Sequence, residues 1–293
     1  MAFFMPPADY QLVALANGAP TLYSARYGEK LHPGLGPAAE ADLLYVRQLQ
    51  ICRRLLAAAG EFVIWDVGLG AAANALAVLR ATRELPGRLR LLSFDDTSEP
   101  LAFAQTHAAE LGYLAGYEEQ VARLLADRQV TFANGNMHVT WQFCLGDFPA
   151  WIEQRAASPN GLESSPHAVF FDAFSPAKNP AMWTLPVLAN LFRSLPPGRP
   201  CALTTYTRST LVRAALLLAG FYVGTGQASG RKEETTIAAN CRDLVAGPLD
   251  ARWLLRAARS DSAEPLREPV YTRSPIRPET LAQLRQHPQF AAK

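Results

Sequence analysis

Four short apolar segments of this chain, each suited to a β-strand, close with a glycine or an aspartate. In chain order these closing residues are Gly68, Asp95, Asp147 and Asp172. The carboxyl ends of parallel strands meet at one edge of an open α/β sheet, and ligands bind at that edge. One such carboxylate is ordinarily a helix cap, but capping alone hardly explains four in succession. The pattern therefore predicts an α/β sheet with a ligand site along one edge.

The first segment, residues 62–67, runs through the glycine turn at 68–70 into an alanine-rich stretch expected to be helical over 71–85. Glycines let the backbone approach a ligand closely, and the start of a helix offers free N–H groups. The motif is weak by itself, because Ala73 stands where a GxGxxG pattern has its third glycine. Such a turn can also serve packing alone, so the sequence leaves nucleoside binding and packing both open here.

Two further carboxylates have the spacing of a nucleoside site. Asp95 lies about 25 residues after Gly70. An acidic residue at about this distance from a glycine turn can accept hydrogen bonds from both hydroxyls of an adenosine ribose, which suits NAD, FAD and S-adenosylmethionine alike. Asp147, after the third segment, can meet an adenine amino group. The alternative for Asp95 is a cap for a helix that starts near Ser98.

The stretch 168–183, AVFFDAFSPAKNPAMW, is the most distinctive part of the sequence. A buried strand over 168–171 ends at Asp172, and the loop 173–180 that follows carries two prolines. Prolines fix φ and restrict the residue before them, so this loop is expected to be stiff. A carboxylate on a stiff loop at the ligand edge suits a binding or catalytic site. The simpler interpretation is that Asp172 caps a helix starting near Trp183.

The order of the predicted elements indicates the type of sheet. Five strand–helix units, with an inserted helix over 117–127, are followed by a strand pair over 221–225 and 234–240. That order is typical of the class I S-adenosylmethionine methyltransferase fold, a Rossmann-like, mostly parallel sheet of seven strands with one antiparallel strand. A NAD-binding Rossmann fold would continue with another strand–helix unit.

We divide the chain into three parts by composition. Residues 1–60 form an N-terminal segment with a helix expected over 37–56, and residues 61–243 form the α/β domain. Residues 244–293 form an extension rich in proline and arginine. Because its prolines interrupt regular structure, we expect this extension to wrap the domain, reach a partner or be partly disordered.

The formal net charge of +2 implies little, but the distribution of charge implies more. Between Asp172 and Glu233 the chain has no acidic residue and seven basic ones. These are Lys178, Arg193, Arg199, Arg208, Arg213, Arg231 and Lys232. The asymmetry favours a polyanion near the predicted ligand edge. The alternative is a set of solvated helix faces.

Other features limit the compartment and the chemistry. The four cysteines are far apart and lack metal-type spacing, which fits a reducing cytoplasm. The N-terminus lacks the basic start and long apolar run of a signal peptide, and no apolar run is long enough to cross a membrane. His32 has no cysteine or histidine near it in the sequence, so we interpret it as a loop residue and expect no metal site.

The segment DAFSPAKNPAMW (172–183) resembles the DAF-x-P-x-KNP-x-MW signature of the methyltransferase domain of the MnmC family. Three other segments agree in order and spacing: ARYGEKLHP (25–33), DVGLGAAANAL (66–76) and GRKEE (230–234). The resemblance covers roughly residues 20–240, and KNP-x-MW is its specific part. The family's FAD-binding oxidase domain has no counterpart in this sequence, so the resemblance implies a stand-alone methyltransferase.

The resemblance implies an S-adenosylmethionine-dependent enzyme that methylates the aminomethyl nitrogen of uridine 34, the wobble nucleotide of tRNA. A separate FAD-dependent oxidase or uridine-modifying enzyme would supply the amine. The cofactor would be held by Gly68, Gly70, Asn74, Asp95, Asp147, Asp172, Ala173 and Phe174. Asp172 would also lie beside the amine as the catalytic residue. The RNA would meet Lys178, Asn179, Arg231 and Lys232.

The sequence departs from the family's pattern at two points. Ala71-Ala72 stand where the family's glycine loop has Thr-Gly, and Asp95-Asp96 stand where it has a glutamate and a basic residue. We expect the alanines to stiffen the loop and narrow the cofactor's approach. Two rival hypotheses follow. The first is a relative that binds RNA or a protein partner without a cofactor, and the second is a methyl or aminopropyl transferase acting on a small amine.

Overall fold

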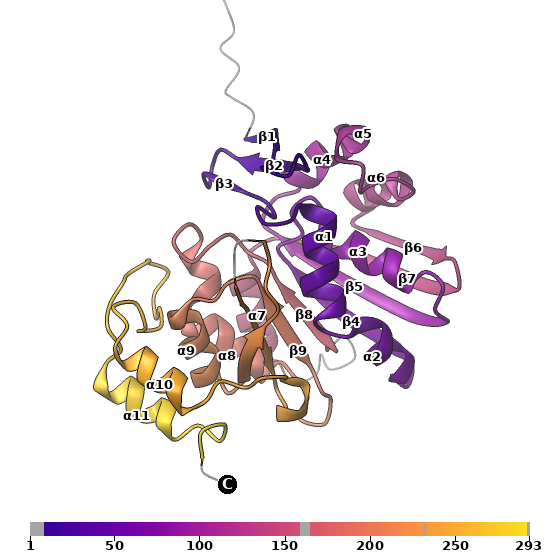
Figure 1. The fold of residues 1–293 in the computed structure, drawn as a ribbon. Coiled ribbons are helices and arrows are strands. Elements are labelled where there is room, and N and C mark those ends of the chain that lie inside the picture. The colour runs from indigo at the N-terminus through magenta and orange to yellow at the C-terminus, as the bar shows by residue number, and fades with distance from the viewer. Residues whose placement is uncertain (1–8, 159–164, 231–232, 292–293) are drawn as a thin grey trace, which may run out of the picture.

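The structure is a computed structural model that describes residues 9–158, 165–230 and 233–291. Its main sheet has eight strands in the order β10-β11-β9-β8-β4-β5-β7-β6. Figure 1 labels the strands of this sheet from β9 to β6. The five central strands are parallel: β9 (Ala202–Thr205), β8 (Ala168–Phe171), β4 (Glu61–Val67), β5 (Gly87–Asp95) and β7 (Met137–Leu145). Each antiparallel pairing involves an outer strand, namely β6 (Gln129–Asn134), β11 (Thr235–Ala239) or β10 (Tyr222–Gly226).

This topology confirms the predicted class I methyltransferase fold, with one strand more than the seven expected. The additional strand is β6, in a segment where we expected the helix α6 (Glu118–Asp127) followed only by a loop. Gly135, at φ 60°, turns the chain so that β6 and β7 pair as a hairpin. Because Asn134 pairs with Met137, the two turn residues are Gly135 and Asn136, and a Gly-Asn pair between two strands is a hairpin signal in the sequence.

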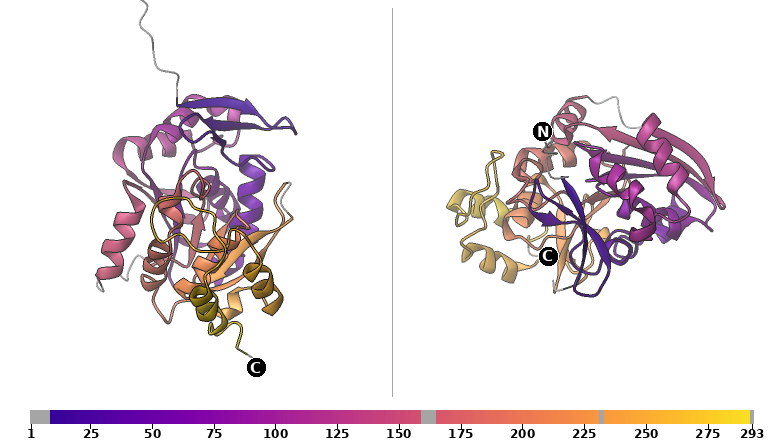
Figure 2. Two further views of the ribbon diagram at one scale, coloured as in Figure 1. Left: turned by 90° about the vertical axis from the view of Figure 1, so that its left-hand side faces the viewer. Right: turned by 90° about the horizontal axis from the view of Figure 1, so that it is seen from above.

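Helices cover both faces of the main sheet (Figure 2). The side chains of each strand alternate between these two faces. From β4, Phe62 and Ile64 pack into one core, while Val63, Trp65 and Val67 pack into the other. The first layer consists of α1 (Pro37–Ala41), the π-helix η1 (Asp42–Arg47), α2 (Ile51–Ala57), α3 (Ala73–Thr82), α4 (Glu99–Thr106), α5 (Ala108–Leu111) and α6. The second consists of α7 (Phe148–Ala157), α8 (Leu185–Arg193) and α9 (Thr210–Ala219).

The N-terminal segment forms a small sheet of its own above the main one. The antiparallel strands β1 (Tyr10–Ala14), β2 (Pro20–Ser24) and β3 (Glu29–Lys30) make up this sheet, at the top of Figure 1. Tyr10 packs against Phe103 of α4, with 6.5 Å between the ring centroids. The helix expected over 37–56 is broken, because Gln50 adopts a left-handed φ of 51° between η1 and α2.

The C-terminal extension wraps the second helical layer, the first of the three arrangements considered for it. Its helices α10 (Ala251–Ala258) and α11 (Pro278–Arg285) lie beside α9 in Figure 1, after the short 3-10 helix η4 (Arg242–Leu244). Trp253 and Leu266 are buried in the same core as α8 and α9. The Gln289 amide accepts from Val223 N at 2.7 Å and donates to Val223 O at 2.8 Å, which covers the outer side of the edge strand β10.

None of the helices in the described parts of the chain has both the length and the apolar character needed to span a bilayer.

Candidate active site

A cavity of about 640 Å³ opens where β4, β5, β7 and β8 end. This volume falls in the range of about 300–1,000 Å³ that is usual for small-molecule sites. Eight of the predicted site residues line it: Gly68, Gly70, Asp95, Asp147, Asp172, Ala173, Phe174 and Asn179. The four closing residues that the sequence suggested would share one edge therefore do meet around a single cavity.

The glycine turn is joined to Asp95 by a hydrogen bond. Gly70 N donates to Asp95 Oδ2 at 2.8 Å, and Thr97 N donates to the other oxygen at 3.3 Å. Gly68 has a φ of 95°, and a Cβ there would lie 2.7 Å from the carbonyl oxygen of Asp172, so no larger residue fits. Burial raises the pKa of Asp95 to about 7, although the Gly70 N–H opposes the shift.

The two alanines of the turn face the core. Ala71 and Ala72 are buried in the core beside α3, and the lining residues from this turn are Gly68 to Gly70. The expectation that the alanines narrow the cofactor's approach is therefore corrected. Ala72 adopts φ 63°, the left-handed conformation that suits glycine and costs an L-residue about 1 kcal/mol. The turn thus keeps its glycine-like shape despite the substitution.

Asp172 is held by Asn74 and does not cap a helix. Asn74 Nδ2 donates to Asp172 Oδ2 at 2.8 Å, whereas α8 is capped by Thr184, whose Oγ1 accepts from Val187 N at 3.4 Å. Burial raises the pKa of Asp172, and His32 and Asn74 oppose this shift. Asn74 itself is buried, and it is not among the described residues that line the cavity. We predicted that Asn74 contacts the cofactor; the contact that the structure shows for its side chain is the one with Asp172.

The loop after Asp172 is fixed by several hydrogen bonds, as its prolines suggested. Trp183 Nε1, in the 3-10 helix η3 (Pro180–Trp183), donates to Phe174 O at 2.7 Å. Tyr206 OH donates to Ala173 O at 3.0 Å. Lys178 is exposed, and its Nζ would lie 3.6 Å from a Cβ placed at Gly28. Lys178 therefore lies outside the cavity, beside the turn between β2 and β3.

The N-terminal segment supplies site residues that sequence reasoning missed. Glu29 accepts from Ser175 N at 3.2 Å and from the Ser175 hydroxyl. Tyr27 stacks on Phe174 with 4.0 Å between ring centroids. The Arg26 guanidinium lies over the Tyr27 ring, 5.2 Å from its centroid. Glu29 and Ser175 are 146 residues apart, so only the resemblance of ARYGEKLHP to a family segment could have indicated these contacts.

His32 also lines the cavity. Its Nε2 lies 3.8 Å from Asp172 Oδ2. The interpretation of His32 as a mere loop residue is therefore corrected, because its side chain lies next to the Asp172 carboxylate. In the parts of the chain that the structure describes, no group of three or more His, Cys, Asp or Glu side chains is arranged to hold a metal ion.

The cavity wall is rich in carboxylates. Six acidic side chains line it, from Glu29, Glu40, Asp95, Asp96, Asp147 and Asp172. The lysine and arginine among the lining residues are Lys30 and Arg26, and Arg26 is paired with Asp96 at 3.8 Å. Such a wall attracts cations such as a sulfonium or an ammonium and repels phosphate. A polyanionic substrate therefore has to keep its phosphates outside this cavity.

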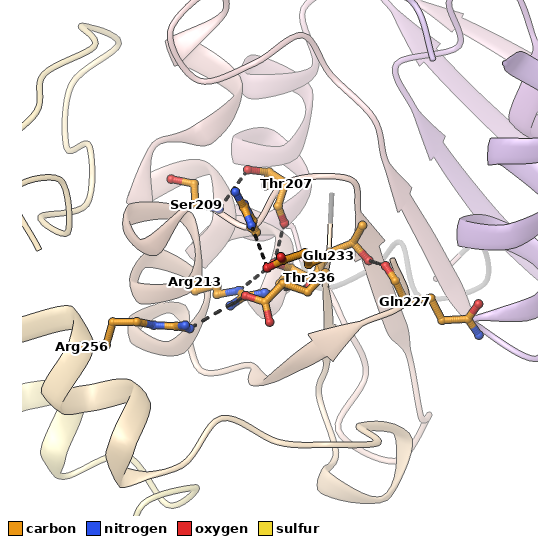
Figure 3. Close-up of polar contacts among 10 residues, drawn as sticks. Thr207, Ser209, Arg213, Gln227, Glu233, Thr236 and Arg256 are labelled. Carbon is orange, nitrogen blue, oxygen red and sulfur yellow. Dashed lines mark hydrogen bonds and ion pairs between the residues drawn. The ribbon is translucent and has the colours of Figure 1, made fainter. Parts of the chain in front are cut away.

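The loop end of the β10–β11 hairpin is anchored by a buried arginine (Figure 3). Arg213 of α9 donates to Glu234 Oε1 at 2.8 Å and to Thr236 Oγ1 at 3.0 Å. This basic residue is therefore structural, which corrects its inclusion among the residues that favour a polyanion. Arg231 and Lys232, predicted to meet RNA, lie outside the described residues.

Comparison with known proteins agrees with the geometry. Residues 115–241 match the model of a family described as S-adenosyl-L-methionine-dependent methyltransferase. Over 229 residues the chain is 31% identical to the tRNA 5-methylaminomethyl-2-thiouridine biosynthesis bifunctional protein MnmC of Cupriavidus metallidurans, covering 74% of this chain and 32% of that protein. The chain has an MnmC-like methyltransferase domain. It spans about a third of the length of the curated relatives it matches.

Solved structures agree at the level of the fold. The MnmC2 protein of Aquifex aeolicus superposes with a TM-score of 0.68 at 24% identity, covering 94% of this chain and 84% of that one. A spermidine synthase superposes with a TM-score of 0.51 at 10% identity, covering 80% and 71% of the two chains. These likenesses bear on the fold alone.

The residues of this MnmC-like domain fit S-adenosylmethionine. The cavity has the volume of a small-molecule site, and its carboxylate wall suits the positive sulfonium. The glycine turn keeps its shape and leaves Gly68 and Gly70 on the cavity wall. The predicted cofactor and enzyme class, an S-adenosylmethionine-dependent methyltransferase, are confirmed by the family match.

Proposed function

We propose that this chain transfers the methyl group of S-adenosylmethionine to the aminomethyl nitrogen of uridine 34 in tRNA. One observation supports this most: Asp172, from the MnmC-like signature, lines a carboxylate-rich cavity beside the glycine turn. The curated relatives are named for the biosynthesis of tRNA 5-methylaminomethyl-2-thiouridine. Methylation of a 5-aminomethyl nitrogen is the step that would yield that nucleoside.

In this proposal the closing residues of the strands hold the cofactor. Asp95 accepts hydrogen bonds from the ribose hydroxyls, Asp147 accepts from the adenine amino group, and the backbone of Gly68 and Gly70 contacts the cofactor. Ala173 and Phe174 contact it from the signature loop. Asn74 acts indirectly, because its amide fixes the Asp172 carboxylate.

The chemistry requires alignment more than a nucleophile from the protein. The bound cofactor supplies a methyl group already activated by the positive sulfur. Asp172 attracts the amine and orients it toward that methyl, and holding reacting groups in line lowers a barrier by several kcal/mol. The carboxylate wall repels phosphates, so the RNA backbone stays outside the cavity, on the side of the exposed Lys178. Asn179, on the cavity wall, meets the nucleotide that enters, and Arg231 and Lys232 stay predicted RNA contacts. A separate FAD-dependent oxidase or uridine-modifying enzyme supplies the amine.

The test is methyl transfer from labelled S-adenosylmethionine to tRNA that carries 5-aminomethyluridine, read by mass spectrometry of the nucleosides. We expect one added methyl on that nucleoside, and none on the same tRNA with unmodified uridine. Asp172→Asn should fold normally and lower the rate by about 100-fold or more. Methylation of a small polyamine at the same rate as this tRNA would contradict the proposal and favour the small-amine transferase instead.

A further inference from the structure

We propose that His32 is a second catalytic residue, which accepts the proton that the amine must lose before methyl transfer while Asp172 holds the amine. This inference rests on the function proposed above and assigns one chemical step of it.

The geometry places an imidazole and a carboxylate on either side of one point in the cavity. His32 Nε2 lies 3.8 Å from Asp172 Oδ2, and the two side chains are 10% and 13% exposed. This separation is too long for a hydrogen bond between them. A nitrogen about 3 Å from both atoms would complete a triangle, which is the reach that proton transfer needs. The pair can therefore receive one amine from two sides.

The backbone at His32 is held in an uncommon conformation. Its φ of 49° is left-handed, which is infrequent for a residue other than glycine. Both flanks are fixed: Leu31 N donates to Leu22 O at 2.8 Å, and Gly34 N donates to Glu40 Oε2 at 3.1 Å. Strained conformations that the surroundings hold in place cluster at functional sites.

Charged and titratable groups surround this part of the cavity. The charged and titratable side chains around this part of the cavity are Glu29, Lys30, Glu40, Tyr45, Asp172 and Tyr206. Three of these are carboxylates and one is a lysine, so an ammonium substrate meets mostly acidic groups here. Asp172 Oδ2 already accepts from Asn74, which suits a carboxylate that orients the amine. An imidazole exchanges protons readily near neutral pH.

The step balances without any further reactant. The aminomethyl group arrives as an ammonium, and one proton passes from its nitrogen to His32 Nε2. The freed lone pair forms the N–C bond while the C–S bond breaks and its electron pair stays on sulfur. The product is a secondary ammonium, and the imidazolium then returns its proton to water.

The test compares wild type with His32→Asn in single-turnover methyl transfer across pH. Asparagine tolerates the left-handed backbone but carries no base. We expect the rate near about pH 7 to fall by about 100-fold or more. The variant should approach wild type as pH rises, because the amine then loses its proton in solution. Calorimetric binding of S-adenosylmethionine should be unchanged. A merely structural role would not produce this pH dependence.

Two further variants complete the experiment. His32→Gly accepts the same φ and leaves a space, so added imidazole should restore part of its rate. His138→Asn is the matched control, because this exposed histidine lies at the start of β7, away from the cavity. It should behave as wild type.

The outcomes separate this inference from the proposed function. An active wild type whose His32→Asn variant has the same rate and pH profile would overturn the role of His32 alone. If His32→Asn fails to fold, the absence of any imidazole rescue of His32→Gly would overturn it. A folded wild type that does not methylate this tRNA would overturn the proposed function, and the inference with it.

Discussion

Asn74 and Asp172 are joined by a 2.8 Å hydrogen bond between residues 98 positions apart. The bond links the first turn of α3, which follows the glycine turn, to the end of β8. It connects the cofactor side of the cavity with the loop that carries the MnmC-like signature. The Asn74 amide thus acts as the support that orients the Asp172 carboxylate.

Substitutions at these two residues should show that the stability of the fold requires one carboxylate and one amide in this pair. Asn74→Asp places a second carboxylate against Asp172, and like charges this close cannot both ionise without cost. We expect the free energy of unfolding to fall by roughly 2–4 kcal/mol above about pH 8, and by less at about pH 5, where the pair can share a proton. Urea unfolding at the two pH values measures this.

The double variant Asn74→Asp, Asp172→Asn is the control for that prediction. It restores one carboxylate and one amide, so most of the lost unfolding free energy should return. Methyl transfer should not return, because the carboxylate then belongs to α3. A double variant no more stable than Asn74→Asp would show that the hydrogen bond is incidental.

Cofactor affinity should depend on the ionisation of Asp95. Its pKa is raised to about 7, and an ionised carboxylate accepts hydrogen bonds from ribose hydroxyls better than a neutral one. Affinity for S-adenosylhomocysteine, whose sulfur carries no charge, should therefore rise as pH increases through about 7. Calorimetric titrations on either side of that pH measure the change. Asp95→Asn should bind more weakly and lose most of this dependence; an identical slope in the variant would exclude Asp95 as its source.

Asp66 should destabilise the fold as pH rises. Its Oδ2 accepts from the Ser93 hydroxyl at 2.9 Å, while its Oδ1 is buried and has no hydrogen-bond partner among the described residues. Burial raises its pKa to about 8, whereas in the unfolded chain it is about 4. Its contribution to stability is thus fully present below about pH 4 and is lost as pH rises through about 8.

Asp66→Asn tests that dependence with a neutral side chain of the same shape. The difference between the unfolding free energy of the variant and that of wild type should increase in favour of the variant by up to a few kcal/mol as pH rises from about 4 to about 8. Asp127→Asn, on the exposed end of α6, should follow wild type. A constant difference between Asp66→Asn and wild type across this range would contradict the assignment.

Gln289 should stabilise the edge of the main sheet. Its amide bonds the N–H and the carbonyl of Val223 and also the carbonyl of Leu249. Gln289→Ala removes the partner of the Val223 N–H and of the Leu249 carbonyl, whereas the Val223 carbonyl keeps the Leu249 N–H at 2.9 Å, so we expect a loss of about 1–3 kcal/mol in urea unfolding. Gln286→Ala, at an exposed position three residues earlier, is the comparison. Equal stability of the two variants would mean that water replaces the Gln289 amide fully.

The fold was predictable where the signal is local. The buried run before Gly68, the alanine-rich helix after it and the aspartates at 95, 147 and 172 each follow from a few adjacent residues. Parallel sheets bring strand ends together, so those local patterns also located the cavity. β6 was missed although the Gly135-Asn136 turn signals a hairpin.

Contacts between distant segments could not be predicted in the same way. Nothing near His32 in the sequence indicates that it faces Asp172, because that proximity depends on how the N-terminal segment crosses the main sheet. The stacking of Tyr27 on Phe174 has the same cause. Arg213 was counted as part of a basic surface because its burial against Glu234 appears only once α9 and β11 are packed.

The most direct test of the central claim is calorimetric titration of the purified protein with S-adenosylmethionine and S-adenosylhomocysteine. The cavity and its carboxylate wall predict micromolar binding of both, despite the altered glycine turn at Ala71 and Ala72. Folded protein that binds neither ligand would contradict the account, and would leave the cofactor-free RNA- or partner-binding relative as the better description.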